Sequence, residues 1–204
     1  MKTVVIYYST TEGQTSKIAE AIARELAYRE CATHLVLSGE QEWSFDPRNY
    51  DGVILGAAVH VGRFAERFQQ QVSKNAERLN GIPIAFYSVC LGILETDNLK
   101  TQEAERQIVR GFLEKVGLRP VLQAIFAGAI RYSKYGFLKK AVLHRIAKRA
   151  GVKTQTDRDY EFTDWNAVKK FADDFVAILE GAPDRVREFP TDYRGEPSGR
   201  PKGV

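Results

Sequence analysis

The alternation of short apolar runs with segments of helical apolar spacing constrains this chain most. Such alternation predicts a parallel sheet whose strands are joined by crossover helices. The apolar runs suited to strands cover residues 3–8, about 33–37, 52–57, 82–89 and about 121–129. Helices are expected from about Gln14, around Phe64 to Val72, over 101–116, and from an N-cap at Thr163 to a stop at Gly181. One α/β domain over residues 1–180 follows.

A basic segment, about 131–162, lies between the fifth predicted strand and the last helix. The whole chain carries a net charge of +4, yet residues 131–153 hold eight cations and no acidic residue, so the remainder carries −4. The cations are Arg131, Lys134, Lys139, Lys140, Arg145, Lys148, Arg149 and Lys153. Apolar residues at helical spacing predict a basic amphipathic helix that binds an anionic membrane or an acidic ligand. An ordinary surface helix packed on the domain is the alternative, and no recognition motif supports a nucleic-acid partner.

Composition and the two ends of the sequence predict where the protein works. No apolar run approaches the roughly 18 residues of a membrane span, and the first residues enter a strand pattern without the features of a signal peptide. A cytoplasmic protein is expected. Cys31 and Cys90 fit no metal spacing and are expected to be free thiols, so no metal site is predicted. Residues 181–204 hold four of the seven prolines and are predicted to be a disordered tail.

The turn between the first strand and the first helix is rich in hydroxyl groups. Its candidate ligands for a phosphate are Ser9, Thr10, Thr11, Glu12, Gly13, Gln14 and Thr15. Free N–H groups at a helix N-terminus favour an anion, and a glycine allows the backbone to approach it closely. The turn lacks both the dinucleotide glycine pattern and the P-loop ending. Helix capping by the hydroxyls is the alternative, but the position after the first strand favours a phosphate site.

Two further loops should meet this turn at the carboxyl edge of the sheet. In a sheet of order 2-1-3-4-5 a ligand binds beside the switch point between strands 1 and 3. The candidate residues after strands 3 and 4 are Ala57, Ala58, Val59, His60, Gly62, Ser88, Val89, Cys90, Leu91 and Gly92. The second loop has no aromatic residue, and the first offers only His60 before Phe64. A planar ligand bound between these loops would therefore keep one face open to a flat partner. His60 is expected to be a solvated side chain and Cys90 a packing residue.

The Ser/Thr-rich turn, ending in Gly13-x-Thr15 before a helix, resembles the flavodoxin signature. That resemblance implies FMN, whose phosphate flavodoxins hold with hydroxyls and amides. The fold class expected is therefore a flavodoxin-like three-layer sandwich with a five-stranded parallel sheet and a basic helical insertion before the last helix. Electron-carrier flavodoxins usually sandwich the flavin ring between aromatic residues of the two further loops, and this sequence departs from that pattern.

More of the chain is similar to the flavodoxin-type protoporphyrinogen oxidases of bacteria, also called menaquinone-dependent protoporphyrinogen IX dehydrogenases. The similarity covers residues 1–179. It rests on the phosphate turn, Asn49-Tyr50-Asp51, Gly56-Ala57-Ala58 with Gly62, Ala85-Phe86-Tyr87-Ser88-Val89, 127–132 with Tyr135, and Thr163-Asp164-Trp165. A long insertion before the last helix sets that family apart from flavodoxins, and this chain has one in that place.

The resemblance implies an enzyme that oxidises protoporphyrinogen IX to protoporphyrin IX through FMN, late in haem synthesis. It implies a quinone, menaquinone or ubiquinone, as electron acceptor, and a peripheral position on the inner face of the cell membrane. Arg or Lys of the insertion would pair the substrate's propionates or the membrane. The candidates are Arg131, Lys134, Lys139, Lys140, Arg145, Lys148 and Arg149. No catalytic acid or base is assigned. An NAD(P)H-dependent quinone reductase and a non-enzymatic flavodoxin electron carrier remain alternatives.

Overall fold

The computed structural model describes residues 1–39, 43–94, 98–131 and 159–181. Its main sheet has five parallel strands in the order β2-β1-β3-β4-β5. The strands are β1 (Thr3–Ser9), β2 (Ala32–Leu37), β3 (Gly52–Ala58), β4 (Ile84–Cys90) and β5 (Leu122–Ala127). The predicted strand order and sheet type are therefore confirmed.

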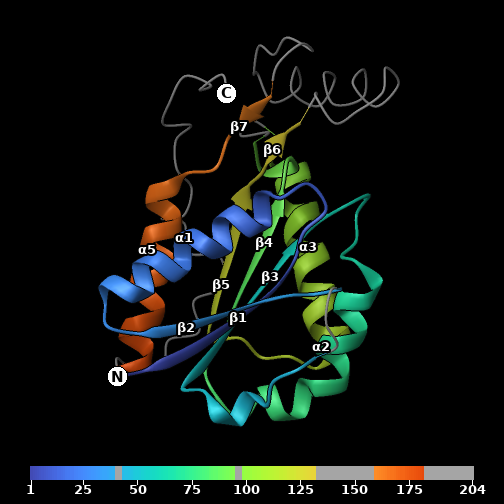
Figure 1. The fold of residues 1–204 in the computed structure, drawn as a ribbon. Helices are drawn as coiled ribbons and strands as arrows, with labels where there is room; N and C mark the ends of the chain where they lie inside the picture. Colours follow the sequence, from blue (N-terminus) through green and yellow to red (C-terminus); the bar gives the residue numbers. More distant parts are fainter. Residues whose placement is uncertain (40–42, 95–97, 132–158, 182–204) are drawn as a thin grey trace.

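Helices cover both faces of the sheet and complete three layers (Figure 1). On one face lie α1 (Gln14–Tyr28) and α5 (Trp165–Leu179), and on the other lie α2 (Glu66–Leu79) and α3 (Leu99–Val116). Short 3₁₀ turns occur at Pro47–Asn49 and Gly92–Leu94. Because both sheet faces are buried, the central strands are continuous apolar runs.

Alternate residues of each strand enter two separate cores. Val4, Ile6 and Ile54 face α1 and α5, whereas Val5, Val53 and Leu55 face α2 and α3. Burying a large apolar side chain contributes about 1.5–3 kcal/mol, so two continuous cores hold the sheet between its helices.

Three predicted boundaries were wrong by a few residues. The fifth strand was expected to reach residue 129, but β5 ends at Ala127, after which the Gly128 carbonyl accepts from the Phe162 N–H and the chain pairs with a new partner. Residues Ala129–Ile130 form a separate strand, β6, which pairs antiparallel with β7 (Tyr160–Glu161). Phe64 lies before α2 and not in it, and β4 begins after Pro83, which has no N–H for the sheet.

The predicted N-cap of the last helix was also wrong. Asp164 caps α5, since its carboxylate accepts from the N–H groups of Asn166 and Ala167. Thr163 turns inward instead and is 9% exposed. Aspartate and threonine are both good caps, so local sequence could not choose between two neighbours. The predicted insertion helix and the tail lie outside the described residues.

Candidate functional site

The parallel register brings the three predicted loops to one edge of the sheet. Ser9 at the end of β1 lies opposite Ala57 of β3, and Ala57 lies opposite Ser88 of β4. From β1 the chain crosses to β2 on one side, whereas β3, β4 and β5 follow on the other side. The edge beside β1 and β3 is therefore the switch point at which an open α/β sheet binds its ligand.

The turn after β1 ends in a helix that begins without a side-chain cap. Gly13 occupies the N-cap position with φ 94°, a conformation that favours glycine. The Thr10 hydroxyl oxygen accepts from the Gly13 N–H at 2.9 Å and so shapes the turn. No acidic residue lies in the first turn of α1, whereas α3 and α5 are capped by Asn98 and Asp164. The positive end of α1 is thus left for an anion.

Thr15 supplies the clearest sign of a missing partner in this turn. Its side chain is 1% exposed, and its hydroxyl oxygen has no hydrogen-bond partner among the described residues. A buried hydroxyl without a partner costs about 1–3 kcal/mol, and a phosphate that accepted a hydrogen bond from it would remove this cost. Of the other predicted phosphate ligands, Gln14 is buried, Thr11 is exposed, and Ser9, Thr10, Glu12 and Gly13 are half-buried.

A buried tyrosine holds the start of α1 against the sheet. The Tyr87 hydroxyl of β4 donates to the Thr15 carbonyl at 3.2 Å, and burial raises the pKa of Tyr87 well above its usual value. The ring crosses Gly56 of β3, where an added Cβ would lie 2.1 Å from its Cζ atom. Glycine at this position therefore makes room for the side chain that supports the phosphate turn.

A second polar connection joins the same helix to the end of the insertion. The Gln14 amide nitrogen donates to the Thr163 hydroxyl at 2.8 Å, and that hydroxyl donates to the Ala127 carbonyl at 2.8 Å. Beside it, Lys17 pairs with Glu161 of β7 at 2.9 Å, and the Trp165 ring N–H donates to the same carboxylate. Sequence reasoning missed the bonds of Gln14 and Lys17, because they join residues 149 and 144 positions apart.

Glu161 is ionised because its partners outweigh its burial. Burial acts to raise the pKa of this carboxyl, but the hydrogen bond and charge of Lys17 lower it, as do hydrogen bonds from Gln14 and Trp165. The pKa of Glu161 therefore lies below its usual value. The insertion thus returns to the domain through a charged anchor next to the phosphate turn.

The loop after β3 forms a tight hairpin with an unusual residue at its tip. His60 and Arg63 exchange both backbone hydrogen bonds, at 2.9 and 3.3 Å, and Val61 and Gly62 have φ 50° and 72°. Two consecutive positive φ values in a two-residue hairpin are typical of a type I′ turn, which prefers Asn-Gly. A left-handed valine costs about 1–2 kcal/mol. The Val61 side chain is nevertheless 87% exposed, so no packing offsets this strain.

The loops after β3 and β4 offer a bound ring mainly backbone and small side chains. Phe64 is 2% exposed and packs against Phe86 and Phe112 with ring centroids 5.6 and 5.0 Å away, so it is not free to stack. His60 and Gly62 are exposed, Val59, Ala58, Leu91 and Gly92 are half-buried, and Ala57, Ser88 and Val89 are buried. The open ring face expected from the sequence remains a prediction.

Cys90 is enclosed in the core, as a packing residue would be. Its side chain is 5% exposed, and burial, followed by the nearby Glu105 carboxylate, raises the pKa of its thiol well above the usual value. A protonated thiol is a poor nucleophile. Any contact of Cys90 with a ligand would be through its backbone.

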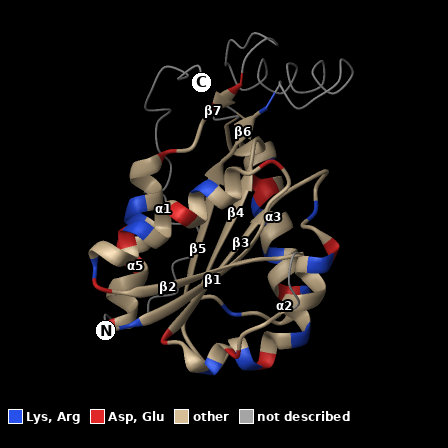
Figure 2. Ribbon diagram, in the orientation of Figure 1, with Lys and Arg blue, Asp and Glu red and all other residues tan. Residues whose placement is uncertain are grey.

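Arg131 is the one predicted insertion cation that lies among the described residues. Its guanidinium lies 3.7 Å from the Asp159 carboxylate across β6 and β7, and each side chain is 16% exposed. This pair joins the two ends of the insertion. Lys134, Lys139, Lys140, Arg145, Lys148, Arg149 and Lys153 lie outside the described residues, shown in grey in Figures 1 and 2.

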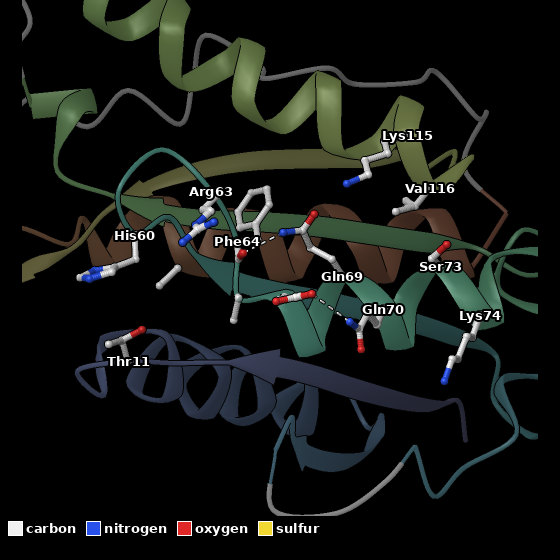
Figure 3. A pocket seen from close by; sticks show the side chains of 13 residues that line it. Thr11, His60, Arg63, Phe64, Gln69, Gln70, Ser73, Lys74, Lys115 and Val116 are labelled. Atoms are coloured by element: carbon white, nitrogen blue, oxygen red, sulfur yellow. Dashed lines mark hydrogen bonds between the residues drawn. The ribbon is translucent and has the colours of Figure 1, made fainter.

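A groove of about 870 Å³ extends from this edge along α2 to the end of α3 (Figure 3). Thr11, Ala58 and His60 line it where it meets the predicted cofactor loops, and Arg63, Lys74 and Lys115 supply its positive charge. Sequence reasoning missed these three cations, since they come from one loop and two helices and share no motif. The volume lies within the range of small-molecule sites.

These features define a flavodoxin-type protein, and comparison with known proteins gives the same class. A flavodoxin domain family matches residues 5–157. Solved structures with this fold include oxidised flavodoxin 1 from Bacillus cereus, with a TM-score of 0.53 and 16% identity over 85% of this chain and 97% of that one. Rubredoxin:oxygen oxidoreductase from Desulfovibrio gigas aligns with a TM-score of 0.55 and 13% identity, over 89% of this chain and 37% of that one.

Two curated relatives narrow the class. Protoporphyrinogen IX dehydrogenase (quinone) of Escherichia coli K12 is 33% identical over 183 residues, 88% of this chain and 97% of that protein. The Leishmania major protein of the same name is 33% identical over 90% of this chain and 78% of that protein. The chain belongs to this protoporphyrinogen IX dehydrogenase family of oxidoreductases. Among the described helices, none is both long and apolar enough to cross a bilayer.

Proposed function

We propose that this chain binds FMN, oxidises protoporphyrinogen IX to protoporphyrin IX and passes the electrons to a membrane quinone. The observation that supports FMN binding is the buried, unpartnered Thr15 hydroxyl at the uncapped start of α1. The substrate and the acceptor come from the names of the two relatives, each of which is a protoporphyrinogen IX dehydrogenase (quinone).

The FMN phosphate would lie in the turn after β1. Its ligands would be hydroxyls and N–H groups of Ser9, Thr10, Thr11, Glu12, Gly13, Gln14 and Thr15. Ala57, Ala58, Val59, His60 and Gly62 would flank the ring on one side, and Ser88, Val89, Cys90, Leu91 and Gly92 on the other. When bound, FMN supplies the redox chemistry, while the chain supplies orientation and electrostatics.

The insertion would serve an anionic partner, either the propionates of the substrate or the surface of the membrane. Its candidates are Arg131, Lys134, Lys139, Lys140, Arg145, Lys148 and Arg149. Neutralising Lys139, Lys140, Arg145 and Lys148 should leave FMN binding nearly intact and weaken binding to anionic vesicles or substrate by about 1 kcal/mol per cation. The loss should shrink as salt screens the charges. A raised substrate KM in detergent would favour the propionates, and reduced vesicle binding alone would favour the membrane.

The deciding experiment reconstitutes the full chain with FMN and follows porphyrin formation with menaquinone or ubiquinone analogues, and with NADH and NADPH in place of porphyrinogen. Porphyrin formation that depends on FMN and quinone supports the proposal. Quinone reduction by NADH or NADPH without porphyrinogen oxidation would identify a quinone reductase instead, and turnover with neither donor would leave an electron carrier. Tight FAD binding with weak FMN binding would contradict the cofactor assignment.

A matched pair of threonine variants links any activity to the phosphate turn. Thr15→Ala removes the unpartnered buried hydroxyl, whereas Thr33→Ala changes a threonine opposite Val4, at the other end of the sheet. The first should weaken FMN binding and the second should not. Equal FMN affinity in both variants would mean that the phosphate binds elsewhere.

A further inference from the structure

The groove along α2 has an excess of positive charge that the fold does not use. Arg63, Lys74 and Lys115 line it, and Glu66 is the one carboxylate among the described lining residues. None of the ion pairs found between described residues includes any of the three cations, while the Glu66 carboxylate accepts from Gln70. Figure 3 shows Arg63 at the end near His60, and Lys74 and Lys115 at the other end.

The hairpin at the His60 end of the groove carries an exposed apolar side chain, Val61. His60 and Arg63 line the groove, and Val61 lies between them at the tip, left-handed and 87% exposed. Asparagine or glycine would adopt this turn with less strain. The free energy lost to the left-handed backbone of Val61 is not offset by packing in the free protein. A strained, exposed, apolar residue beside a groove therefore points to a function in ligand contact.

The position of the groove relates it to the predicted flavin site. Thr11, Ala58 and His60 belong both to the predicted cofactor loops and to the lining of the groove. A molecule that lies over the mouth of the groove would therefore touch the flavin site and Arg63 at one end and reach Lys74 and Lys115 at the other.

From these observations we propose that the groove is the binding site of a flat apolar dicarboxylate, with Val61 against its ring system and Arg63, Lys74 and Lys115 at its carboxylates. This inference rests on the proposed function, in which the substrate is a tetrapyrrole with two propionates. It assigns the propionates to residues of the domain itself and leaves the insertion cations for the membrane surface.

The test measures binding of protoporphyrin IX and of its dimethyl ester to the FMN-loaded full chain in mild detergent. The ester has the same ring but no charge. Wild-type protein should bind the acid about tenfold more tightly than the ester, because two partly exposed ion pairs contribute. The triple variant Arg63→Gln, Lys74→Gln and Lys115→Gln should lose this preference, with its FMN affinity and melting temperature nearly unchanged.

A control variant separates the groove from net charge. Arg24→Gln, Arg78→Gln and Arg119→Gln remove three exposed cations that do not line the groove, and Arg78, like Lys115, lies in the last turn of its helix. This control should keep the preference for the acid. Val61→Asn should weaken binding of acid and ester alike, by about fivefold, without lowering the melting temperature. If the triple variant does not fold, its three single substitutions should each reduce the preference in part.

The inference is overturned if the triple variant keeps the preference for the acid, if the control loses it equally, or if Val61→Asn binds both porphyrins normally. Because binding needs no turnover, the two proposals fail separately. A preference lost in the triple variant of a chain that does not oxidise protoporphyrinogen would support the groove and contradict the proposed function. If the wild-type chain oxidises protoporphyrinogen but the groove variants keep an unchanged KM, the proposed function is supported and the groove is contradicted.

Discussion

The two faces of the sheet are built differently although they share the same five strands. On one face α1 and α5 are joined by ion pairs, with Arg29 2.8 Å from Asp173 and Lys169 2.6 Å from Glu25. On the other face, α2 and α3 enclose an aromatic cluster but leave a groove lined by cations. Ion pairs between the helices therefore close one face, whereas the other face keeps a cationic groove along α2.

The largest expected effects come from removing one large buried side chain from each of the two cores. Phe171 packs against Phe126 on the closed face, and Phe68 stacks on Tyr7 on the open face, and both are fully buried. Phe171→Ala and Phe68→Ala should each lower the free energy of unfolding by about 3–5 kcal/mol in urea titrations. Tyr28→Ala, at a site 79% exposed, is the control and should change little. A cost below about 1 kcal/mol for Phe68→Ala would mean that the open face is not a true core.

The next largest effects should appear in FMN binding at the turn that precedes α1. Thr15→Ala and Thr10→Ala should each weaken FMN binding by about 0.5–1.5 kcal/mol, or up to about 3 kcal/mol where the hydroxyl bonds the charged phosphate. Gly13→Val should lose more, since φ is 94° there and valine rarely adopts it. Fluorescence titration of FMN gives these values. Unchanged affinity in all three variants would place the phosphate elsewhere.

Two glycine substitutions compare a crowded position on the closed face with an open position on the other face. Gly56→Ala puts a Cβ within 2.1 Å of the Tyr87 ring on the closed face, and should cost about 1–3 kcal/mol of stability as well as weaken FMN binding through Thr15. Gly111→Ala on α3 meets no atom within 4 Å and should stabilise the protein by about 0.5–1 kcal/mol. Thermal melting compares the two. Equal effects of both variants would argue against tight packing at Gly56.

The smallest expected effect concerns the anchor of the insertion. The folded-state pKa of Glu161 is lowered, so the ionised carboxylate stabilises the fold above its usual titration range, near pH 4.3, and this contribution is lost as pH falls through the folded pKa. A half-exposed pair of this kind contributes less than about 1 kcal/mol. Glu161→Gln should therefore flatten the stability curve slightly below pH 5, whereas Glu20→Gln should not. An identical acid response in both variants would exclude Glu161 as the cause.

Sequence reasoning predicted what depends on neighbours along the chain. Apolar periodicity located the five strands and the helices, and the Ser/Thr-rich turn before Gly13 is the basis of the predicted phosphate site. Sequence reasoning failed where two good caps are neighbours, as at Thr163 and Asp164, and where a strand ends because the chain changes its pairing partner, as at Gly128 with Phe162. No local pattern could join Gln14 to Thr163, because their hydrogen bond forms only when the first and last helices meet.

By itself, therefore, the sequence determined the class of fold, the turn that suits a phosphate and the charge of the insertion, because periodicity, turn chemistry and charge are properties of short segments. Tertiary structure alone decided which buried hydroxyl lacks a partner, that Val61 is strained and exposed, and that Arg63, Lys74 and Lys115 share one groove. Those properties depend on how the elements are placed relative to one another. The packing of two helical layers against one sheet sets that placement.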